Sequence, residues 1–178
     1  MTVRLRTARL DLTPFGTSDL DHFHALSVQP GVRRYLWDDE AISLDRARET
    51  LEANERLWAE RGFGLFALRV REHVEPIGYA GLWEMPGRAV AELLYALGMD
   101  WWHRGYATEA SLAIMQDAVS RLGHPKIVAS TDAPNEASIR VLHRLGMTPV
   151  RRGVAAGLDI VFFEIAATDV LSDPASSP

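Results

Sequence analysis

The residues best suited to chemistry gather where a helix-forming run begins, in the stretch WWHRGYATEA at positions 101–110. Gly105 stands at the helix entrance, with His103 and Arg104 before it and the small Ala107 after it. A helix N-terminus exposes unpaired backbone N–H groups and the positive end of the helix dipole, so it binds anions. A glycine there lets an anion approach the backbone closely, and the arrangement suits a pyrophosphate. Taken alone, the stretch is equally consistent with a turn glycine and core packing.

The composition excludes several other kinds of site. The 178 residues include no cysteine, which excludes disulfides, thiolate metal sites and an enzyme thiol nucleophile. The formal net charge of −5 argues against a general nucleic-acid surface. His22 and His24 diverge by about 200° on a helix, so we expect no metal site there. The N-terminus lacks a signal-peptide core and no run reaches membrane-spanning length, so we expect a cytoplasmic protein without membrane contacts.

The hydrophobic pattern predicts an α/β chain with one domain over residues 1–170 and a polar tail over 171–178. The expected order is a strand, two helices, three strands, a helix, a strand, a helix and two strands. These elements cover, in order, residues 5–14, 17–28, 43–61, 64–72, 76–85, 89–99, 105–122, 126–131, 134–146, 147–153 and 158–167. The middle three strands are typical of an antiparallel meander, and Pro30–Gly31 marks a break after the first helix.

Two segments resemble the central motifs of the GNAT superfamily of N-acetyltransferases: AELLYALGMDWWHRGYATEA and, after it, STDAPNEASIRVLHRLGM. The chain looks most like the RimJ/RimL-like branch, which LRTARLDLTPF, GVRRYL and PIGYAGL also match. The resemblance covers residues 3–166, nearly the whole chain. It implies a GNAT fold, an α/β architecture with a mixed, mostly antiparallel sheet of about seven strands and about four flanking helices. It also implies acetyl-CoA as the acetyl donor, with no metal.

The resemblance also assigns cofactor-binding roles to particular residues. The turn at 103–108 is expected to donate backbone N–H groups to the pyrophosphate of coenzyme A. The strand end from Leu97 to Met99 is expected to pair with the pantetheine arm, Asn135 to bond the arm near its thiol, and Ser138 to face the sulfur. The expected cofactor residues are Leu97, Gly98, Met99, His103, Arg104, Gly105, Tyr106, Ala107, Thr108 and Asn135.

Acetyl transfer to an amine needs a base and a polarised thioester carbonyl. Without a cysteine, direct attack of the amine on acetyl-CoA is the simplest route. Glu92, on the third strand of the meander, is the candidate catalytic base, and Glu84 on the preceding strand is its competitor. The alternative for Glu92 is that it is an ordinary solvent-exposed carboxylate on a strand, without a catalytic role. A strand N–H near Leu97 or Gly98 is a candidate donor to the oxyanion.

The leaving thiolate is the other half of the reaction. Many family members carry a tyrosine seven residues after the asparagine, but Leu142 stands at that position here. Ser138 is therefore the candidate that protonates the departing sulfur, although a serine in a first helical turn also has an ordinary structural explanation. A free thiol has a reference pKa of about 8.5, so the thiolate leaves tolerably without a strong acid.

The acceptor side rests on the segment YLWDDE, residues 35–40. Trp37 and Asp38 can attract a cationic amine, and a solvated acidic loop is the alternative. We expect an N-acetyltransferase acting on a primary amine of a peptide or small molecule, with Trp37, Asp38 and Glu84 as acceptor-binding residues and no nucleic-acid partner. A non-catalytic acyl-CoA-binding or interaction module of the same fold is the alternative, and a homodimer is left open.

Overall fold

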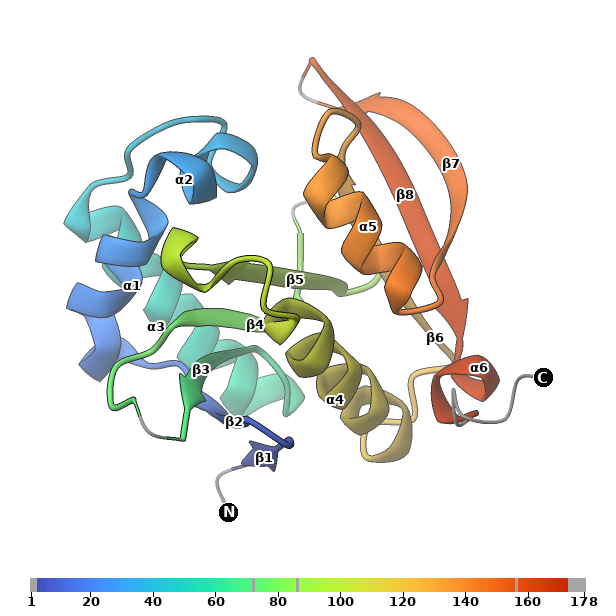
Figure 1. The fold of residues 1–178 in the computed structure, drawn as a ribbon, viewed down its shortest axis with the longest axis horizontal. Helices are drawn as coiled ribbons and strands as arrows, with labels where there is room; N and C mark the ends of the chain where they lie inside the picture. Colours follow the sequence, from blue (N-terminus) through green and yellow to red (C-terminus); the bar gives the residue numbers. More distant parts are fainter. Residues whose placement is uncertain (1–2, 72, 86, 156, 173–178) are drawn as a thin grey trace.

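The computed structural model describes residues 3–71, 73–85, 87–155 and 157–172, in which an eight-stranded sheet carries helices on both faces (Figure 1). The strands are β1 (Leu5–Arg6), β2 (Leu10–Pro14), β3 (Leu65–Val70), β4 (Gly78–Trp83), β5 (Glu92–Leu97), β6 (Lys126–Asp132), β7 (Thr148–Ala155) and β8 (Leu158–Ala166). The helices are α1 (Leu20–Ser27), α2 (Pro30–Leu36), α3 (Leu44–Arg61), α4 (Tyr106–Ser120), α5 (Glu136–Arg144) and α6 (Ala167–Leu171). Short 3₁₀ turns, Thr17–Asp19 and Met99–Trp101, precede α1 and α4. Most of the expected tail and Pro86 of an expected turn lie outside the described residues.

The strand order is β1-β2-β3-β4-β5-β6-β8-β7, and neighbouring strands are antiparallel except for β5 and β6. This confirms the expected mixed, mostly antiparallel sheet and the meander of β3, β4 and β5. β5 pairs with β4 along its whole length, but with β6 only at Glu92 and Val128. The two strands then diverge, so that the sheet opens into two arms (Figure 1).

The additional strand comes from the N-terminus, where the hydrophobic pattern predicts one strand over residues 5–14. A turn closed by the Thr7 N–H donating to Leu10 O at 2.9 Å divides that segment, and Leu5 lies opposite Leu12. Leu5 and Leu10 are an odd number of positions apart, so one continuous strand would place them on opposite faces. The turn instead packs Leu5 against the core that contains Leu10 and Leu12.

Within the described residues, six helices form where about four were expected. α2 begins at the predicted break: Pro30 occupies its first turn, where the N–H that proline lacks would have no intrahelical acceptor. α6 follows β8 and takes up Ala167, the last residue of the expected final strand. Within the described part of the chain, no helix has the length and apolar character needed to cross a membrane.

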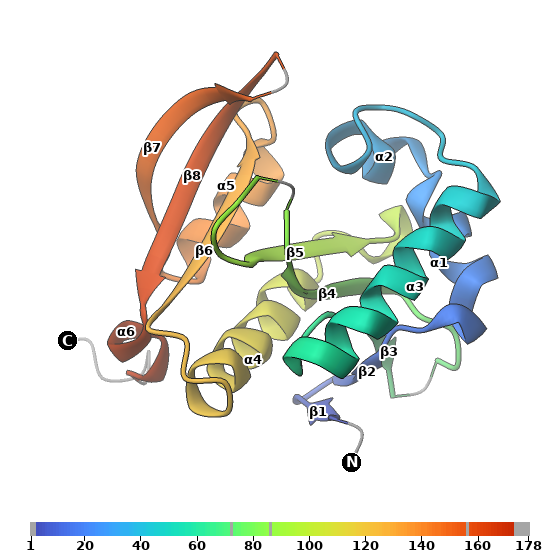
Figure 2. The ribbon, with the colours of Figure 1, turned by 180° about the vertical axis from the view of Figure 1, so that it is seen from behind.

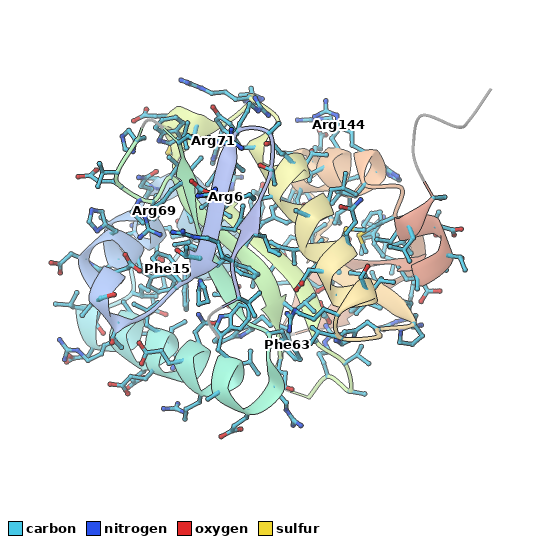
Figure 3. The ribbon with its side chains drawn as sticks, turned by 90° about the horizontal axis from the view of Figure 1, so that it is seen from below. Arg6, Phe15, Phe63, Arg69, Arg71 and Arg144 are labelled. Atoms are coloured by element: carbon cyan, nitrogen blue, oxygen red, sulfur yellow. The ribbon has the colours of Figure 1, made fainter. Side chains whose placement is uncertain are left out.

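The two faces of the sheet carry separate cores. Along β3, Leu65 and Ala67 belong to the core that α1 and α3 cover, whereas Phe66 and Leu68 belong to the core that α4 covers. Views from opposite sides show α4 in front of the sheet in Figure 1 and α3 in front of it in Figure 2. Side chains fill both layers in Figure 3, where Arg69 extends from β3 towards the segment before α1. Below the opening, the sheet is therefore packed by side chains on both faces.

Candidate active site

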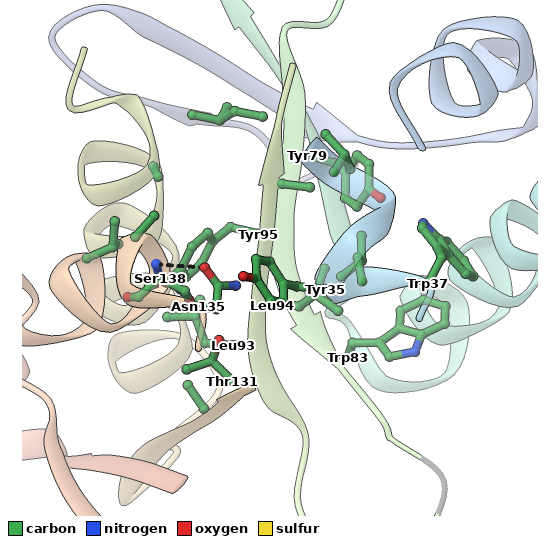
Figure 4. A pocket seen from close by; sticks show the side chains of 18 of the residues that line it. Tyr35, Trp37, Tyr79, Trp83, Leu93, Leu94, Tyr95, Thr131, Asn135 and Ser138 are labelled. Carbon is green, nitrogen blue, oxygen red and sulfur yellow. Dashed lines mark hydrogen bonds between the residues drawn. The ribbon is translucent and has the colours of Figure 1, made fainter. Parts of the chain in front are cut away.

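A cavity of about 1270 Å³ lies where β5 and β6 diverge. Its lining comes from both arms of the sheet, the starts of α4 and α5, and the segment from α2 to α3. In Figure 4, Asn135 and Ser138 lie on one side of β5, and Trp37 and Trp83 lie on the other. We call these the helix-entrance side and the aromatic side. The volume exceeds that of a typical small-ligand pocket, so the cavity has room for two partners.

Gly105 caps the N-terminus of α4 with a φ of 80°, in the left-handed region. No described side chain caps this helix, so the N–H groups of Tyr106, Ala107 and Thr108 have no intrahelical acceptor. A Cβ at Gly105 would meet Arg9 Nη2 at 3.4 Å, an ordinary contact, so the glycine is required by its φ rather than by crowding. The helix entrance opens on the cavity and offers the donors and dipole that bind an anion.

The two residues before this glycine contribute differently. His103 has a φ of 60° and lines the cavity. The Arg104 guanidinium lies 5.2 Å from the centre of the Trp101 ring, and Arg104 is not among the residues that line the cavity. Its carbonyl accepts a hydrogen bond from Arg9 Nη1 at 2.9 Å. The Arg104 side chain therefore stacks on Trp101 outside the cavity lining, and the backbone of this turn is the part that lies at the anion site.

Arg9 fastens the N-terminal hairpin to the first turn of α4. Its backbone N–H and its Nε donate to the two carboxylate oxygens of Glu109 at 2.8 and 2.6 Å, and the Thr7 hydroxyl donates to the same carboxylate at 2.6 Å. Burial raises the pKa of Glu109, but the hydrogen bonds from Thr7 and Arg9 and the Arg9 charge outweigh it and lower the pKa. One hundred residues separate the two partners, so local patterns do not indicate the pair.

The end of β5 does not offer all the backbone groups that the resemblance assigns to the pantetheine arm. The Gly98 N–H donates at 2.9 Å to the carbonyl of the residue before β4, and the Met99 N–H donates to Gln29 Oε1 at 2.9 Å. The Leu97 carbonyl accepts from Trp102 Nε1 at 2.7 Å. The N–H groups of Gly98 and Met99 are therefore already used within the chain, and Gly98 cannot donate to an oxyanion.

The free edge of β5 lies further back along the strand. Residues of an antiparallel strand alternate between its two edges, and the Gly98 bond on the β4 side places the even-numbered residues on that edge. The backbone groups of Leu93, Tyr95 and Leu97 therefore point towards the gap between the arms. Among the three residues assigned from the sequence, Leu97 alone presents its N–H to this gap.

Asn135 caps the N-terminus of α5, where its Oδ1 accepts from the Ser138 N–H at 3.2 Å. Its side chain is half-buried and lines the cavity. Among the residues that the structure describes, Nδ2 has no hydrogen-bond partner, so it remains a donor for a ligand. This asparagine is expected at the thiol end of the cofactor, and the cap fixes its side chain beside Ser138.

The Ser138 hydroxyl is bonded to a residue that no motif indicated. The Tyr95 hydroxyl lies 2.7 Å from Ser138 Oγ and donates to the Ser138 carbonyl at 3.2 Å; Figure 4 labels both residues. Burial raises the pKa of Tyr95 to about 12, although the Ser138 hydrogen bond acts in the lowering direction. Leu142, at the position where many family members carry a tyrosine, is 1% exposed and packs in the core. The signal in the sequence for this role is that Tyr95 stands between Leu93 and Leu97, so that a phenol interrupts the alternating leucines of β5.

Glu92 is buried at the junction of the two arms, with 6% of its surface exposed. The Ser130 hydroxyl donates to Glu92 Oε2 at 2.5 Å, and Arg88 Nε lies 3.5 Å from Oε1. Glu92 lines the cavity. In the β4–β5 pair it lies directly opposite Trp83, a residue of the aromatic side. The solvated alternative for Glu92 is therefore wrong, and a buried carboxylate stands between the two sides of the cavity.

Glu84, the competing carboxylate, has a different environment. It follows β4 at the rim of the cavity, its side chain is 49% exposed, and Arg61 Nε lies 3.3 Å from its Oε1. Of the two carboxylates suggested as a base, Glu92 is the one that the fold buries.

Aromatic side chains line the side of the cavity that faces α2 and α3. Trp37 stands against Phe23 edge-on, with ring centres 6.5 Å apart, and Trp83 and Tyr35 line the same region. The Tyr35 hydroxyl donates to the Pro134 carbonyl at 3.3 Å. The last turn of α2 therefore reaches across to the segment before α5, so that the two sides of the cavity share one wall.

Three acidic residues, Asp38, Glu40 and Asp132, line this part of the cavity, together with the basic Arg46. Asp38 has a φ of 50° and lines the cavity, whereas Asp39 accepts from Arg33 Nε at 3.0 Å and does not line it. Asp132, at the end of β6, also lines the cavity. Burial raises the pKa of Asp132, and the negative charge of Asp38 raises it further. The acidic segment was indicated by the sequence, but its partner on β6 was not.

Comparison with known proteins identifies the family. A family model described as an acetyltransferase (GNAT) domain matches residues 9–148. The chain belongs to the GNAT acetyltransferase family. This confirms the resemblance inferred from the sequence, and it makes the protein an acyltransferase. The GNAT motifs fall on the helix-entrance side, at the start of α4 and of α5.

Individual relatives agree with the family model. The uncharacterized N-acetyltransferase p20 of Bacillus licheniformis is 28% identical over 144 residues, which are 79% of this chain and 80% of p20. A GNAT-family acetyltransferase from Bordetella pertussis has a TM-score of 0.80 at 25% identity, covering 92% of this chain and 99% of that one. RimL, a ribosomal-protein α-N-acetyltransferase solved with coenzyme A, has a TM-score of 0.78 at 18% identity, covering 92% and 98%. The likeness to RimL is one of fold.

Proposed function

We propose that this GNAT enzyme transfers the acetyl group of acetyl-CoA to a primary amine, on a peptide N-terminus or a small molecule, and that it falls in the RimJ/RimL-like branch. One observation carries the proposal: a continuous cavity joins an uncapped helix entrance to a buried carboxylate and an acidic, aromatic wall. An anion site, a base and an attractive surface for a cation are the parts that this reaction needs.

The helix-entrance side fits coenzyme A. The N–H groups of residues 106–108 supply donors for a pyrophosphate, and the free edge of β5 supplies alternating donors and acceptors for an extended amide-containing arm. Asn135 Nδ2 is a further donor at the inner end of this path. Acetyl-CoA supplies the activated acetyl group and its thiolate leaving group.

The central residues supply the proton transfer and the oxyanion donor. Glu92 accepts the proton of the attacking amine, directly or through a water molecule, because it is buried where the two sides of the cavity meet. A backbone N–H at the free edge of β5, that of Tyr95 or Leu97, donates to the oxygen of the thioester carbonyl. Ser138 lies at the inner end of the arm, beside the sulfur.

The aromatic side receives the amine. Asp38 and Asp132 attract a cationic acceptor, and Trp37 and Trp83 enclose its apolar part. Solved structures of the same fold include RimL and acetyltransferases named for the ribosomal proteins they modify. Peptides with a free N-terminal amine are therefore the first acceptors to test.

Binding of acetyl-CoA is tested by calorimetry on the wild type, Gly105→Glu and Gly123→Glu. The new carboxylate at Gly105 repels a pyrophosphate at the helix entrance, and we expect affinity to fall at least about a hundredfold. Gly123 lies beyond the opposite end of α4, has a φ of 70° and has no neighbour within 4 Å of a new Cβ, so it matches the backbone strain. Equal binding by all three proteins would place the pyrophosphate elsewhere.

Acetyl transfer is tested by the release of free thiol from acetyl-CoA across a panel of peptides and small primary amines. Mass spectrometry of the acceptor separates acetylation from hydrolysis. Tight binding of acetyl-CoA with no turnover on any amine would favour the alternative, a non-catalytic acyl-CoA-binding module.

A further inference from the structure

The Tyr95–Ser138 pair spans the gap between the two arms of the sheet. Tyr95 comes from β5, Ser138 comes from the first turn of α5, and their hydroxyl oxygens are 2.7 Å apart. Both residues line the cavity. Since β5 and β6 no longer pair at this level, the contact is one of the few polar links across the opening, and it lies beside Asn135.

The chemistry of the two hydroxyls decides which of them donates. A phenol, with a reference pKa of about 10, is a much stronger acid than an aliphatic hydroxyl and therefore the better donor. Burial raises the pKa of Tyr95 to about 12, so the phenol stays protonated over the working range of an enzyme. The Tyr95 hydroxyl lies 2.7 Å from Ser138 Oγ and 3.2 Å from the Ser138 carbonyl oxygen, so its one proton goes mainly to the nearer Oγ and the carbonyl is a weaker second acceptor. With Ser138 Oγ as the acceptor, the Ser138 proton is free to be donated to a ligand in the cavity.

We propose that Tyr95 is a positioning residue: by donating its hydroxyl proton to Ser138 Oγ, it directs the Ser138 proton at the sulfur of the bound thioester. The proposal rests on the proposed acetyl transfer. Tyr95 provides from β5 a hydroxyl that position 142 does not provide, because the leucine there has no hydroxyl and is buried in the core.

The pair acts by hydrogen bonding rather than by donating a proton outright. A thiol has a reference pKa of about 8.5, so complete transfer from a phenol with a pKa of about 12 is unfavourable by about three orders of magnitude. The amine nitrogen forms its bond to the acetyl carbon, the carbon–sulfur bond breaks, and the electron pair leaves on sulfur. The amine proton goes to Glu92, while the thiolate departs hydrogen-bonded to Ser138 and takes its proton from solvent.

The first test measures the pKa of the thiol of bound coenzyme A from its thiolate absorbance as a function of pH. We expect the wild type to hold this pKa below its value in solution, and Tyr95→Phe to raise it by about one unit. Ser138→Ala raises it at least as much. Tyr79→Phe is the matched control: Tyr79 lines the same cavity on the opposite side of β5 from Ser138 (Figure 4), and its hydroxyl lies 3.3 Å from Ser27 Oγ in a second buried Tyr–Ser pair. It should leave the thiol pKa at the wild-type value.

The second test measures turnover with acetyl-CoA and glycinamide, the smallest mimic of a peptide N-terminus. We expect Tyr95→Phe to lower kcat about 10- to 100-fold while the Kd for acetyl-CoA changes less than about threefold. Because Tyr95 acts through Ser138, adding Tyr95→Phe to Ser138→Ala should have little further effect.

The outcomes separate this proposal from the proposed function. An unchanged thiol pKa in a folded Tyr95→Phe protein, or an equal loss of kcat in the wild-type and Ser138→Ala backgrounds, would overturn the role of Tyr95. A lowered thiol pKa without acetylation of any amine would remove the transfer function while supporting the pair. A wild-type protein that does not bind coenzyme A would overturn both.

Discussion

Two buried polar side chains, Asn54 and Glu92, show how differently this fold uses such groups. Asn54 on α3 is fully buried, and its Nδ2 donates to Phe15 O at 2.7 Å and to Leu65 O at 3.0 Å, while its Oδ1 accepts from the Leu65 N–H at 2.7 Å. Its partners are all backbone groups. Glu92 is 6% exposed, its partners are the side chains of Ser130 and Arg88, and it opens on a cavity.

The difference lies in what each group can still do. The hydrogen bonds of the Asn54 amide join α3 to the end of β2 and the start of β3. They satisfy backbone groups that would each cost about 1–3 kcal/mol of folding free energy if they were buried without a partner. A carboxylate has about four acceptor positions, and the two partners of Glu92 leave capacity that faces the cavity. Backbone partners therefore mark a side chain that holds the fold, and side-chain partners beside a cavity mark one that is available for chemistry.

The largest effect should follow from Glu92→Gln. The amide keeps the size of the side chain and can still accept from Ser130, but it cannot take a proton from the amine. We expect kcat to fall about 100- to 10,000-fold with a melting temperature close to that of the wild type. The same assay on Glu84→Gln separates the two carboxylates. A large loss of kcat in Glu84→Gln with little change in Glu92→Gln would make Glu84 the base and end this comparison.

Asn54→Ala should do the reverse and reduce stability rather than turnover. It leaves Phe15 O and the Leu65 N–H without their partners, whereas Leu65 O keeps Trp58 Nε1 at 3.2 Å. We expect the free energy of unfolding in urea to fall by about 3 kcal/mol. The kcat of the protein that remains folded should stay at the wild-type value, and a kcat loss like that of Glu92→Gln would show that Asn54 also serves the reaction.

Glu109 combines both kinds of partner and should give the smallest effect. Its pKa is lowered in the folded protein, so its contribution to stability is present above the unfolded-state pKa and disappears as the pH falls through the lower folded-state pKa. At pH 7 we expect Glu109→Gln to lose about 1 kcal/mol or less, because Arg9 is half-exposed and solvent screens the pair. Urea unfolding of the wild type and Glu109→Gln over a pH series that falls from 7 checks this, and a difference in stability that does not shrink as the pH falls below the unfolded-state pKa would contradict it.

The sequence predicted those parts whose signals are local. The helix of α4 with Gly105 at its entrance, the three-strand meander and the asparagine before α5 depend on residues within a turn or a strand of one another. The differences are local too. The break at Pro30 is confirmed, but the pattern does not predict the helix that begins there, although proline is well placed in a first helical turn. The odd spacing of Leu5 and Leu10 is a local signal for the turn that divides the first strand.

The remaining parts of the site arise from contacts between distant segments. Tyr95 and Ser138 are 43 residues apart, and Asn54 and Phe15 are 39 apart. No pattern within either segment selects such a partner, because the partner depends on which strands become neighbours and where their pairing stops. The occupied N–H groups of Gly98 and Met99 have the same origin, since their acceptors come from the segments before β4 and α2.

The single pairing between β5 and β6 also has a mechanical consequence. The backbones of the two arms pair only at Glu92 and Val128, which makes that pair the fulcrum of any swing, and side chains such as Tyr95 and Ser138 link the arms farther out. If the arms swing, displacement grows with distance from the fulcrum, so the entrance of α5 travels farther than the carboxylate does. Glu92, the candidate base, therefore moves least when the arms swing, so a partner can enter or leave the cavity without displacing this carboxylate.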